Sequence, residues 1–184
     1  MFVVAISVGQ WAAVAANPAD IIGPILSPHQ AGETWQGQIA GMLEGIPGEQ
    51  THACVGDLRR PWVTVDVRDV AEAHIKIYEK LAAGDPAVSS GDRYLLSDMT
   101  RIHPEDIGAR LNDMYPQYNS AAEVGKDKDG GDSICPIDPL WDRVQARNDM
   151  ACNNLGVSFT AWDVTLRDTV ESLVSIGGVT PRLR

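Results

Sequence analysis

Residues 61–84 restrict the fold more than any other part of the chain, because a strand-like segment there runs directly into a helix-like one. Valines alternate with other residues over 61–67, which is typical of a strand whose valines share one face. From 69 to 83 apolar residues recur at helical spacing, and Gly84 follows where a helix would end. A strand joined so closely to a helix predicts an α/β or α+β arrangement with some parallel strands.

Short strands and helices alternate along the rest of the chain without an internal repeat. The patterns predict strands over 11–16 and 93–97. They predict helices over 33–44, from Pro104 to a stop at Pro116, between Asn148 and Gly156, and from Thr160 onward. Thr160 and Asp163 resemble a capping box, with aspartate in place of the usual glutamate. Asn148 is the expected cap of the short helix that Gly156 ends.

The predicted sheet has only three or four strands, few for a free-standing doubly wound sheet. A partial sheet leaves an open edge, and we expect a protein partner to cover it. Residues 1–184 are expected to form a single α/β domain. Residues 119–139 are rich in polar residues, glycine and proline, which predicts a mobile loop.

Composition excludes several classes of function. Asp and Glu number 25 against 15 Lys and Arg, a net charge of −10, which argues against nucleic-acid binding. No stretch approaches the roughly 20 apolar residues of a transmembrane helix. Cys54, Cys135 and Cys152 form no C-x-x-C pair, so we expect a reducing compartment, either the cytoplasm or an organelle interior, and no targeting signal is readable.

The usual enzymatic motifs do not occur. No two glycines lie two positions apart, so G-x-G-x-x-G is absent, and neither G-x-S-x-G nor H-E-x-x-H occurs. Asp127, Asp129 and Asp132 do not fit a calcium loop, and no metal site is predicted. A partly buried structural role is expected for His74, which lies beside the apolar stripe of its helix.

Three segments together resemble a known family. They are NPADIIGPIL at 17–26, WVTVDVRDVAEAH at 62–74 and TLRDTVESL at 165–173, and residues 93–97 and 154–160 fit the same template. In this order the segments resemble the dihydroflavonol reductase and cinnamoyl-CoA reductase branch of the extended short-chain dehydrogenases/reductases, within the NAD-dependent epimerase/dehydratase superfamily.

The resemblance implies a truncated Rossmann-type fold, made of the last strands of the sheet and the small C-terminal substrate domain. Members of this family reduce a ketone or aldehyde with NADPH. Their glycine-rich loop, catalytic serine and Tyr-x-x-x-Lys lie upstream of the Asn-Pro segment, and none of the four tyrosines here has Lys four residues on. We therefore expect no catalytic residue and no cofactor for the isolated chain, and NADP(H) only if an N-terminal half completes it.

The same resemblance supplies candidate binding residues. The Asn-Pro turn and the backbone after it would meet the cofactor, which gives Pro18 and Ile21. The loop over 25–30 would border the substrate, and its candidate residues are Ile25, Leu26, His29 and Gln30. The plainer alternative is that Pro18 merely ends a strand and that the Gly-Pro pair merely makes a turn. Residues expected to hold the fold by capping the helix are Asp66, Arg68 and Asp69.

Two functions stay open at this point. One is a non-catalytic structural or accessory subunit of a larger assembly, because a fold can persist without its chemistry. The alternative is the C-terminal substrate-binding half of an NADPH-dependent ketone or aldehyde reductase, acting with a separate or missing N-terminal half.

Overall fold

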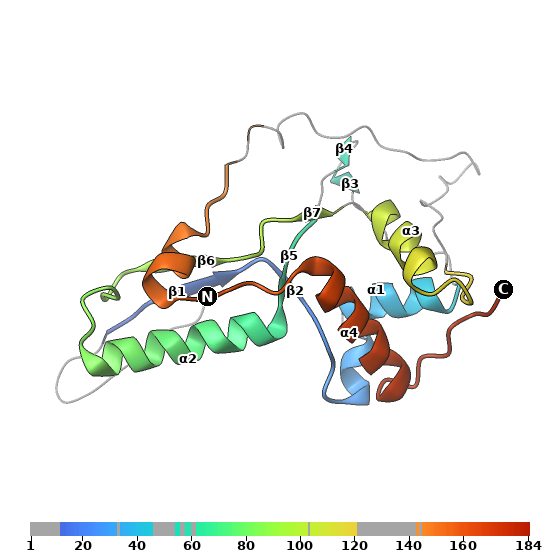
Figure 1. Cartoon of the computed structure of the whole chain (residues 1–184), viewed down its shortest axis with the longest axis horizontal. Helices are drawn as coiled ribbons and strands as arrows, with labels where there is room; N and C mark the ends of the chain where they lie inside the picture. The colour runs from blue at the N-terminus through green and yellow to red at the C-terminus, as the bar shows by residue number, and fades with distance from the viewer. Residues whose placement is uncertain are drawn as a thin grey trace. The chain divides into compact units, whose positions relative to one another are not determined.

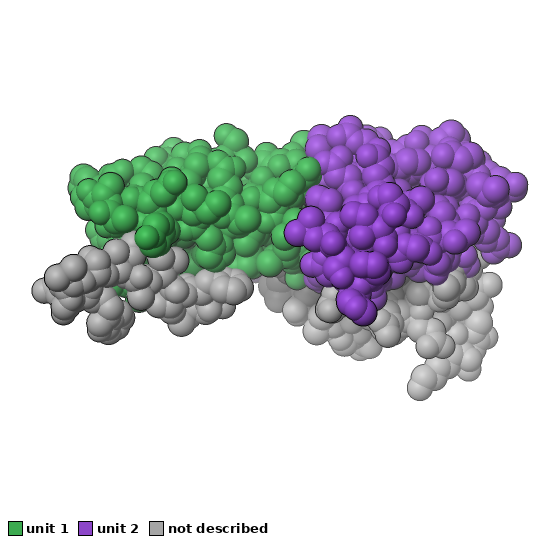
Figure 2. Space-filling model, turned by 90° about the horizontal axis from the view of Figure 1, so that it is seen from below, with its two compact units in different colours: residues 1–21, 63–100, 146–162 green, residues 22–62, 101–145, 163–184 purple. Residues whose placement is uncertain are grey.

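The computed structural model describes residues 12–32, 34–45, 54–55, 58–59, 62–102, 104–120, 143 and 145–184 (Figure 1). Contacts divide the chain into two compact units, coloured separately in Figure 2. Unit 1 comprises 1–21, 63–100 and 146–162, and unit 2 comprises 22–62, 101–145 and 163–184. The single domain expected over 1–184 stays a prediction.

Unit 1 is organised on two parallel strands. β1 (Ala15–Pro18) pairs with β6 (Arg93–Leu96), and Pro18 lies opposite Leu96. The strand predicted over 11–16 is therefore present but shifted, since it begins at Ala15 and runs through Pro18. Ala15 and Ala19 donate their N–H groups to the β6 side, so the even-numbered residues face the other edge. Pro18 has no N–H to donate. At this position an N–H would point away from β6, so its absence does not interrupt the hydrogen bonds between β1 and β6.

The predicted strand and helix of 61–84 are both present. β5 (Trp62–Asp66) lies beside β2 (Asp20–Ile22) and leads into α2 (Val67–Ala83). The helix starts two residues earlier than predicted, because Asp66 and not Asp69 is its N-cap and accepts the N–H of Arg68 at 2.8 Å. Gly84 ends the helix at φ 66°, a left-handed conformation that glycine adopts without strain.

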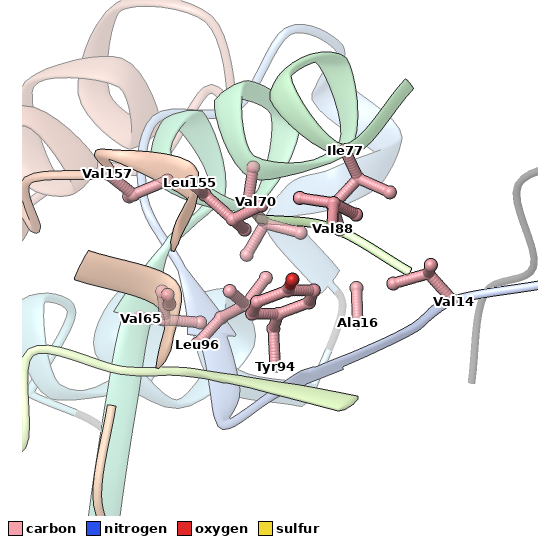
Figure 3. Packing of buried hydrophobic residues seen from close by; sticks show 12 residues of the cluster. Val14, Ala16, Val65, Val70, Ile77, Val88, Tyr94, Leu96, Leu155 and Val157 are labelled. Carbon is pink, nitrogen blue, oxygen red and sulfur yellow. The ribbon is translucent and has the colours of Figure 1, made fainter. Parts of the chain in front are cut away.

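The core of unit 1 lies between α2, the strands and the 151–157 segment (Figure 3). Its buried members are Val14, Ala16, Val65, Val70, Ala73, Ile77, Val88, Tyr94, Leu96, Ala151, Leu155 and Val157. Because these side chains come from segments far apart in sequence, no one segment of unit 1 can bury its apolar face alone.

The short helix predicted over 148–156 is present as the π-helix η3 (Ala151–Leu155), and Gly156 ends it at φ 69°. The predicted cap is wrong. The Asn148 side chain donates to the carbonyl of Ser97 at 2.8 Å and does not cap the helix. Asn148 thus ties the segment before η3 to the end of β6.

The predicted capping box is also wrong. Thr160 donates its N–H and its hydroxyl to Asp69, at 2.7 and 2.8 Å, and α4 (Trp162–Ser175) begins after it. Asp163 pairs with Arg110 instead. In a capping box the Asp163 carboxylate would accept the Thr160 N–H. Here that N–H already donates to the carboxylate of Asp69.

Unit 2 is mainly helical. Its elements are η1 (Pro28–Gly32), α1 (Thr34–Leu43), the antiparallel pair β3 (Cys54–Val55) and β4 (Leu58–Arg59), β7 (Arg101–Ile102), α3 (Pro104–Met114) and most of α4. The helices predicted over 33–44 and from Pro104 to before Pro116 are confirmed as α1 and α3. Of the loop predicted over 119–139, only Asn119 and Ser120 lie within the described residues, and Asn119 donates to the carbonyl of Arg182 at 2.6 Å.

Gly177 provides a test of the packing in unit 2. A Cβ there would lie 2.7 Å from the Leu173 carbonyl oxygen and 3.0 Å from the Ala31 Cβ, so the backbone would have to shift. We expect Gly177→Ala to lower the free energy of unfolding by about 1–3 kcal/mol. Gly41→Ala is the control, because nothing lies within 4 Å of its added Cβ inside α1, and it should stabilise by up to ~1 kcal/mol. Equal effects in urea denaturation would contradict this.

Candidate functional site

The two predicted cofactor residues lie in unit 1. Pro18 is the last residue of β1, and Ile21 lies in β2 and packs partly against the core. Both are half-buried. Pro18 lies at the carboxyl end of a parallel strand and Ile21 follows it, and open α/β sheets bind their ligands at such an end. The structure therefore brings these two residues to a suitable edge, and the binding role stays a prediction.

The four predicted substrate residues lie in unit 2 and have different environments. Ile25 is 2% exposed, and its N–H donates to the Ser172 hydroxyl at 2.9 Å, which ties the loop to α4. The Gln30 side-chain oxygen accepts the N–H of Leu26 at 2.7 Å and of Ser27 at 3.0 Å. Ile25 and Gln30 thus hold the loop itself.

Leu26 and His29 are the members of this set that face solvent. Leu26 is 88% exposed, and His29 lies exposed in η1. A single exposed leucine is common on protein surfaces and is not by itself a site. The division between the units falls between Ile21 and Ile22, so the cofactor and substrate sets belong to different units.

The charged residues at the start of α2 hold the fold, as predicted. Arg68 donates from Nε and Nη2 to the two carboxylate oxygens of Asp66, at 2.9 and 2.7 Å. Burial raises the pKa of Asp69, and the two hydrogen bonds from Thr160 oppose that shift. Asp69 is 5% exposed and its carboxylate oxygens are engaged, so it has the environment of a structural residue.

His74 also has structural surroundings. It is half-buried, and its Nδ1 lies 2.7 Å from the Val70 carbonyl oxygen, one turn earlier in α2. This environment is the one expected from its position beside the apolar stripe.

The turn after β6 is a feature that the sequence did not indicate. Ser97 is fully buried, and its hydroxyl donates to the Thr64 carbonyl at 3.1 Å and accepts the Met99 N–H at 2.9 Å. Met99 has φ 65°, the left-handed region that a residue with a side chain rarely occupies. Met99 is the one non-glycine residue with positive φ among the residues the structure describes, and such strain is often found near functional sites.

Two carboxyl groups flank the same end of the parallel pair. Asp20 and Asp98 each lie two residues beyond the paired Pro18 and Leu96. Burial raises the pKa of both, and for Asp98 hydrogen bonds from Thr100 oppose the shift. A carboxyl with a raised pKa can exchange protons closer to neutral pH. In the described part of the chain no three His, Cys, Asp or Glu side chains gather as a metal site would require.

The chain is similar in sequence to proteins of known family. No protein-family profile matches the chain. Cinnamoyl-CoA reductase CAD2 of Medicago truncatula is 32% identical over 162 residues, which are 87% of this chain and 40% of that protein. Cinnamoyl-CoA reductase 1 of Arabidopsis thaliana is 30% identical over 169 residues, or 91% of this chain and 41% of that protein.

Solved structures share the fold. Yeast methylglyoxal/isovaleraldehyde reductase Gre2, complexed with NADPH, aligns with TM-score 0.57 and 20% identity over 91% of this chain and 47% of its own. Vestitone reductase from alfalfa aligns with TM-score 0.56 and 19% identity over 89% of this chain and 44% of its own. Gre2 from Candida albicans, in complex with NADPH, is 26% identical with TM-score 0.54, over 88% of this chain and 43% of its own.

The fold is thus part of a Rossmann-type reductase fold, as the motifs predicted. The chain is a relative of the extended short-chain dehydrogenases/reductases, through the cinnamoyl-CoA reductases, and it spans about 40% of the length of those relatives. This share fits the predicted C-terminal portion. No helix among the described residues is both long and apolar enough to cross a bilayer.

Proposed function

We propose that this chain is a non-catalytic accessory or structural subunit built on part of a reductase fold. One observation carries the proposal: 87% of the chain matches a cinnamoyl-CoA reductase, yet the match spans 40% of that protein. The 184 residues contain neither G-x-G-x-x-G nor a tyrosine with Lys four positions on. Cofactor phosphates need the glycine-rich turn, and carbonyl reduction in this family needs the tyrosine as a proton donor.

The alternative is a substrate-binding half that works with the rest of a reductase. The exposed Leu26 favours it, because the loop around this residue is held by Gln30 and by Ser172 of α4. A held loop that presents an apolar side chain is suited to contact an apolar substrate. NADPH would be the cofactor of the completed protein, since it is the one bound by the yeast and Candida albicans structural neighbours.

The experiment that tests the accessory function uses the isolated chain with NADPH and cinnamoyl-CoA. We expect no loss of the reduced-nicotinamide absorbance and no shift of the unfolding temperature on adding NADPH. Turnover, or tight NADPH binding by the isolated chain, would overturn the accessory function. The cinnamoyl-CoA reductase from Medicago truncatula is the positive control.

Leu26 tests the alternative in any complex that shows turnover. If the loop borders the substrate, Leu26→Asp should raise KM for an aromatic acyl-CoA about tenfold or more, with a smaller effect on kcat. Leu183→Asp is the matched control, because Leu183 is also in unit 2 and 68% exposed. If both variants behave alike, Leu26 has no role in the pocket.

A further inference from the structure

Residues 180–184 leave the end of α4 and bind to other parts of unit 2 (Figure 1). We call these five residues the strap, and an isolated antiparallel bridge joins them to residues 117–119. The Asn119 N–H donates to the Arg182 carbonyl oxygen at 2.6 Å, and the Arg184 N–H donates to the carbonyl at the other end of that segment at 3.2 Å. The strap and residues 117–119 therefore form a short piece of antiparallel pairing.

The strap is also tied to the end of α1. The Arg182 N–H donates to the Leu43 carbonyl oxygen at 2.8 Å. The Arg182 side chain lies on Gly45, since a Cβ added at Gly45 would be 2.6 Å from the Arg182 Cδ. Through its main chain Arg182 thus joins two segments that are far apart in sequence, the end of α1 and residues 117–119.

No side chain of the strap is buried. Leu183 is 68% exposed, and the other side chains of the strap are exposed or half-buried. Val179, the residue before the strap, is buried, and its N–H donates to the Leu173 carbonyl at 3.2 Å. Main-chain hydrogen bonds rather than core packing therefore hold the strap. A segment held in this way opens at a lower free energy than a core helix.

We propose that the strap opens as one unit beyond Val179, and that the slot it leaves takes the strap of a second copy of the chain. Opening frees the Leu43 carbonyl and the Asn119 N–H, which an extended segment satisfies with main-chain groups. The strap of a second copy carries the matching donor and acceptor on Arg182. Exchange of an identical segment between two copies is a low-cost route to a dimer. Such exchange goes beyond the accessory function and is compatible with either candidate function.

Hydrogen exchange of the native chain tests the opening. The Asn119, Arg182 and Arg184 amides should exchange together, since one opening breaks all three of their bonds. They should exchange about tenfold or more faster than the Ile176 amide, which donates to the Ser172 carbonyl at the end of α4 at 2.8 Å. Protection of Asn119 equal to that of Ile176 would overturn a separate opening of the strap.

Two substitutions at one position test how the strap is held. Arg182→Pro removes the N–H that binds Leu43, and Arg182→Ala is its matched control, because it loses the same side chain and keeps that N–H. The Asn119 amide should exchange about tenfold or more faster in the proline variant than in the alanine variant, with Ile176 unchanged in both. Equal rates at Asn119 would overturn this. Thermal unfolding checks that both variants fold, and if the proline variant does not, the native exchange rates decide.

A synthetic peptide with the sequence of residues 180–184, Thr-Pro-Arg-Leu-Arg, tests the slot. It should bind the Arg182→Pro variant about tenfold or more tightly than the Arg182→Ala variant, in which a tethered strap still competes. The same peptide with proline in place of its first arginine should not bind. No binding of the native peptide, or equal binding of both peptides, would overturn the slot.

Sedimentation tests whether the occupant is a second copy. The native chain should form a dimer as its concentration rises, and the Arg182→Pro variant should dimerise more weakly, because its strap lacks the N–H that Leu43 accepts. A native chain that stays monomeric at every concentration, or equal dimerisation of both chains, would overturn the exchange.

Discussion

Leu96→Ala is expected to lower the free energy of unfolding of unit 1 by about 2–5 kcal/mol. Leu96 is fully buried on β6, and its side chain lies in the cluster that joins β1, β6, α2 and the 151–157 segment (Figure 3). Truncation removes the transfer free energy of the lost methyl groups and leaves a cavity that a close-packed core fills only in part. Urea denaturation monitored by circular dichroism would measure the loss.

The control for this prediction is the same substitution at an exposed leucine. Leu26 is 88% exposed, so Leu26→Ala should change the unfolding free energy by less than about 0.5 kcal/mol. If Leu96→Ala and Leu26→Ala had similar effects, β6 would not be part of a packed core.

Asp69→Ala is the second substitution with a large expected effect. It should lower the free energy of unfolding by about 2 kcal/mol. The substitution removes the acceptor of both the Thr160 N–H and the Thr160 hydroxyl, and the N–H has no alternative acceptor among the bonds the structure describes. Asp163→Asn is the control, because Asp163 pairs with Arg110 at the surface and such pairs contribute less than about 1 kcal/mol. A larger loss for Asp163→Asn than for Asp69→Ala would contradict this ranking.

The two aspartates should also differ in their dependence on pH. Burial raises the pKa of Asp69 above 3.8. Between pH 3.8 and the higher folded pKa, folding therefore takes up a proton. The stability that Asp69 contributes rises as pH falls through this range. The hydrogen bond from Arg110 lowers the pKa of Asp163, so its contribution is present above 3.8 and is lost as pH falls through the lower folded value. The difference in unfolding free energy between the native chain and each variant, measured across acidic pH, would show the opposite slopes.

Local residue order was sufficient to predict most elements. The alternating valines of β5, the helical spacing of α2 and the ending at Gly84 were all correct, because each depends on neighbours within one or two turns. The boundaries were less accurate. α2 began at Val67 rather than Asp69, since two aspartates could cap it and only the folded backbone decided between them.

Candidate site residues were predicted less well than elements. Motif resemblance drew attention to the 25–30 loop, yet it could not distinguish Ile25, which is buried, from Leu26, which is exposed. It also gave no sign of the Ser97 hydroxyl or of the left-handed Met99. These features depend on which distant backbone groups meet the turn after β6, and spacing along the chain does not carry that information.

Sequence alone determined the class of fold and the relationship to reductases, because periodicity and short motifs are local properties that survive in a chain spanning 40% of its relatives. Tertiary structure alone decided the partners of Thr160 and Asp163. Thr160 binds Asp69, and Asp163 pairs with Arg110. Hydrogen bonds between residues far apart in sequence form only after the chain has closed, and so no local pattern could predict them.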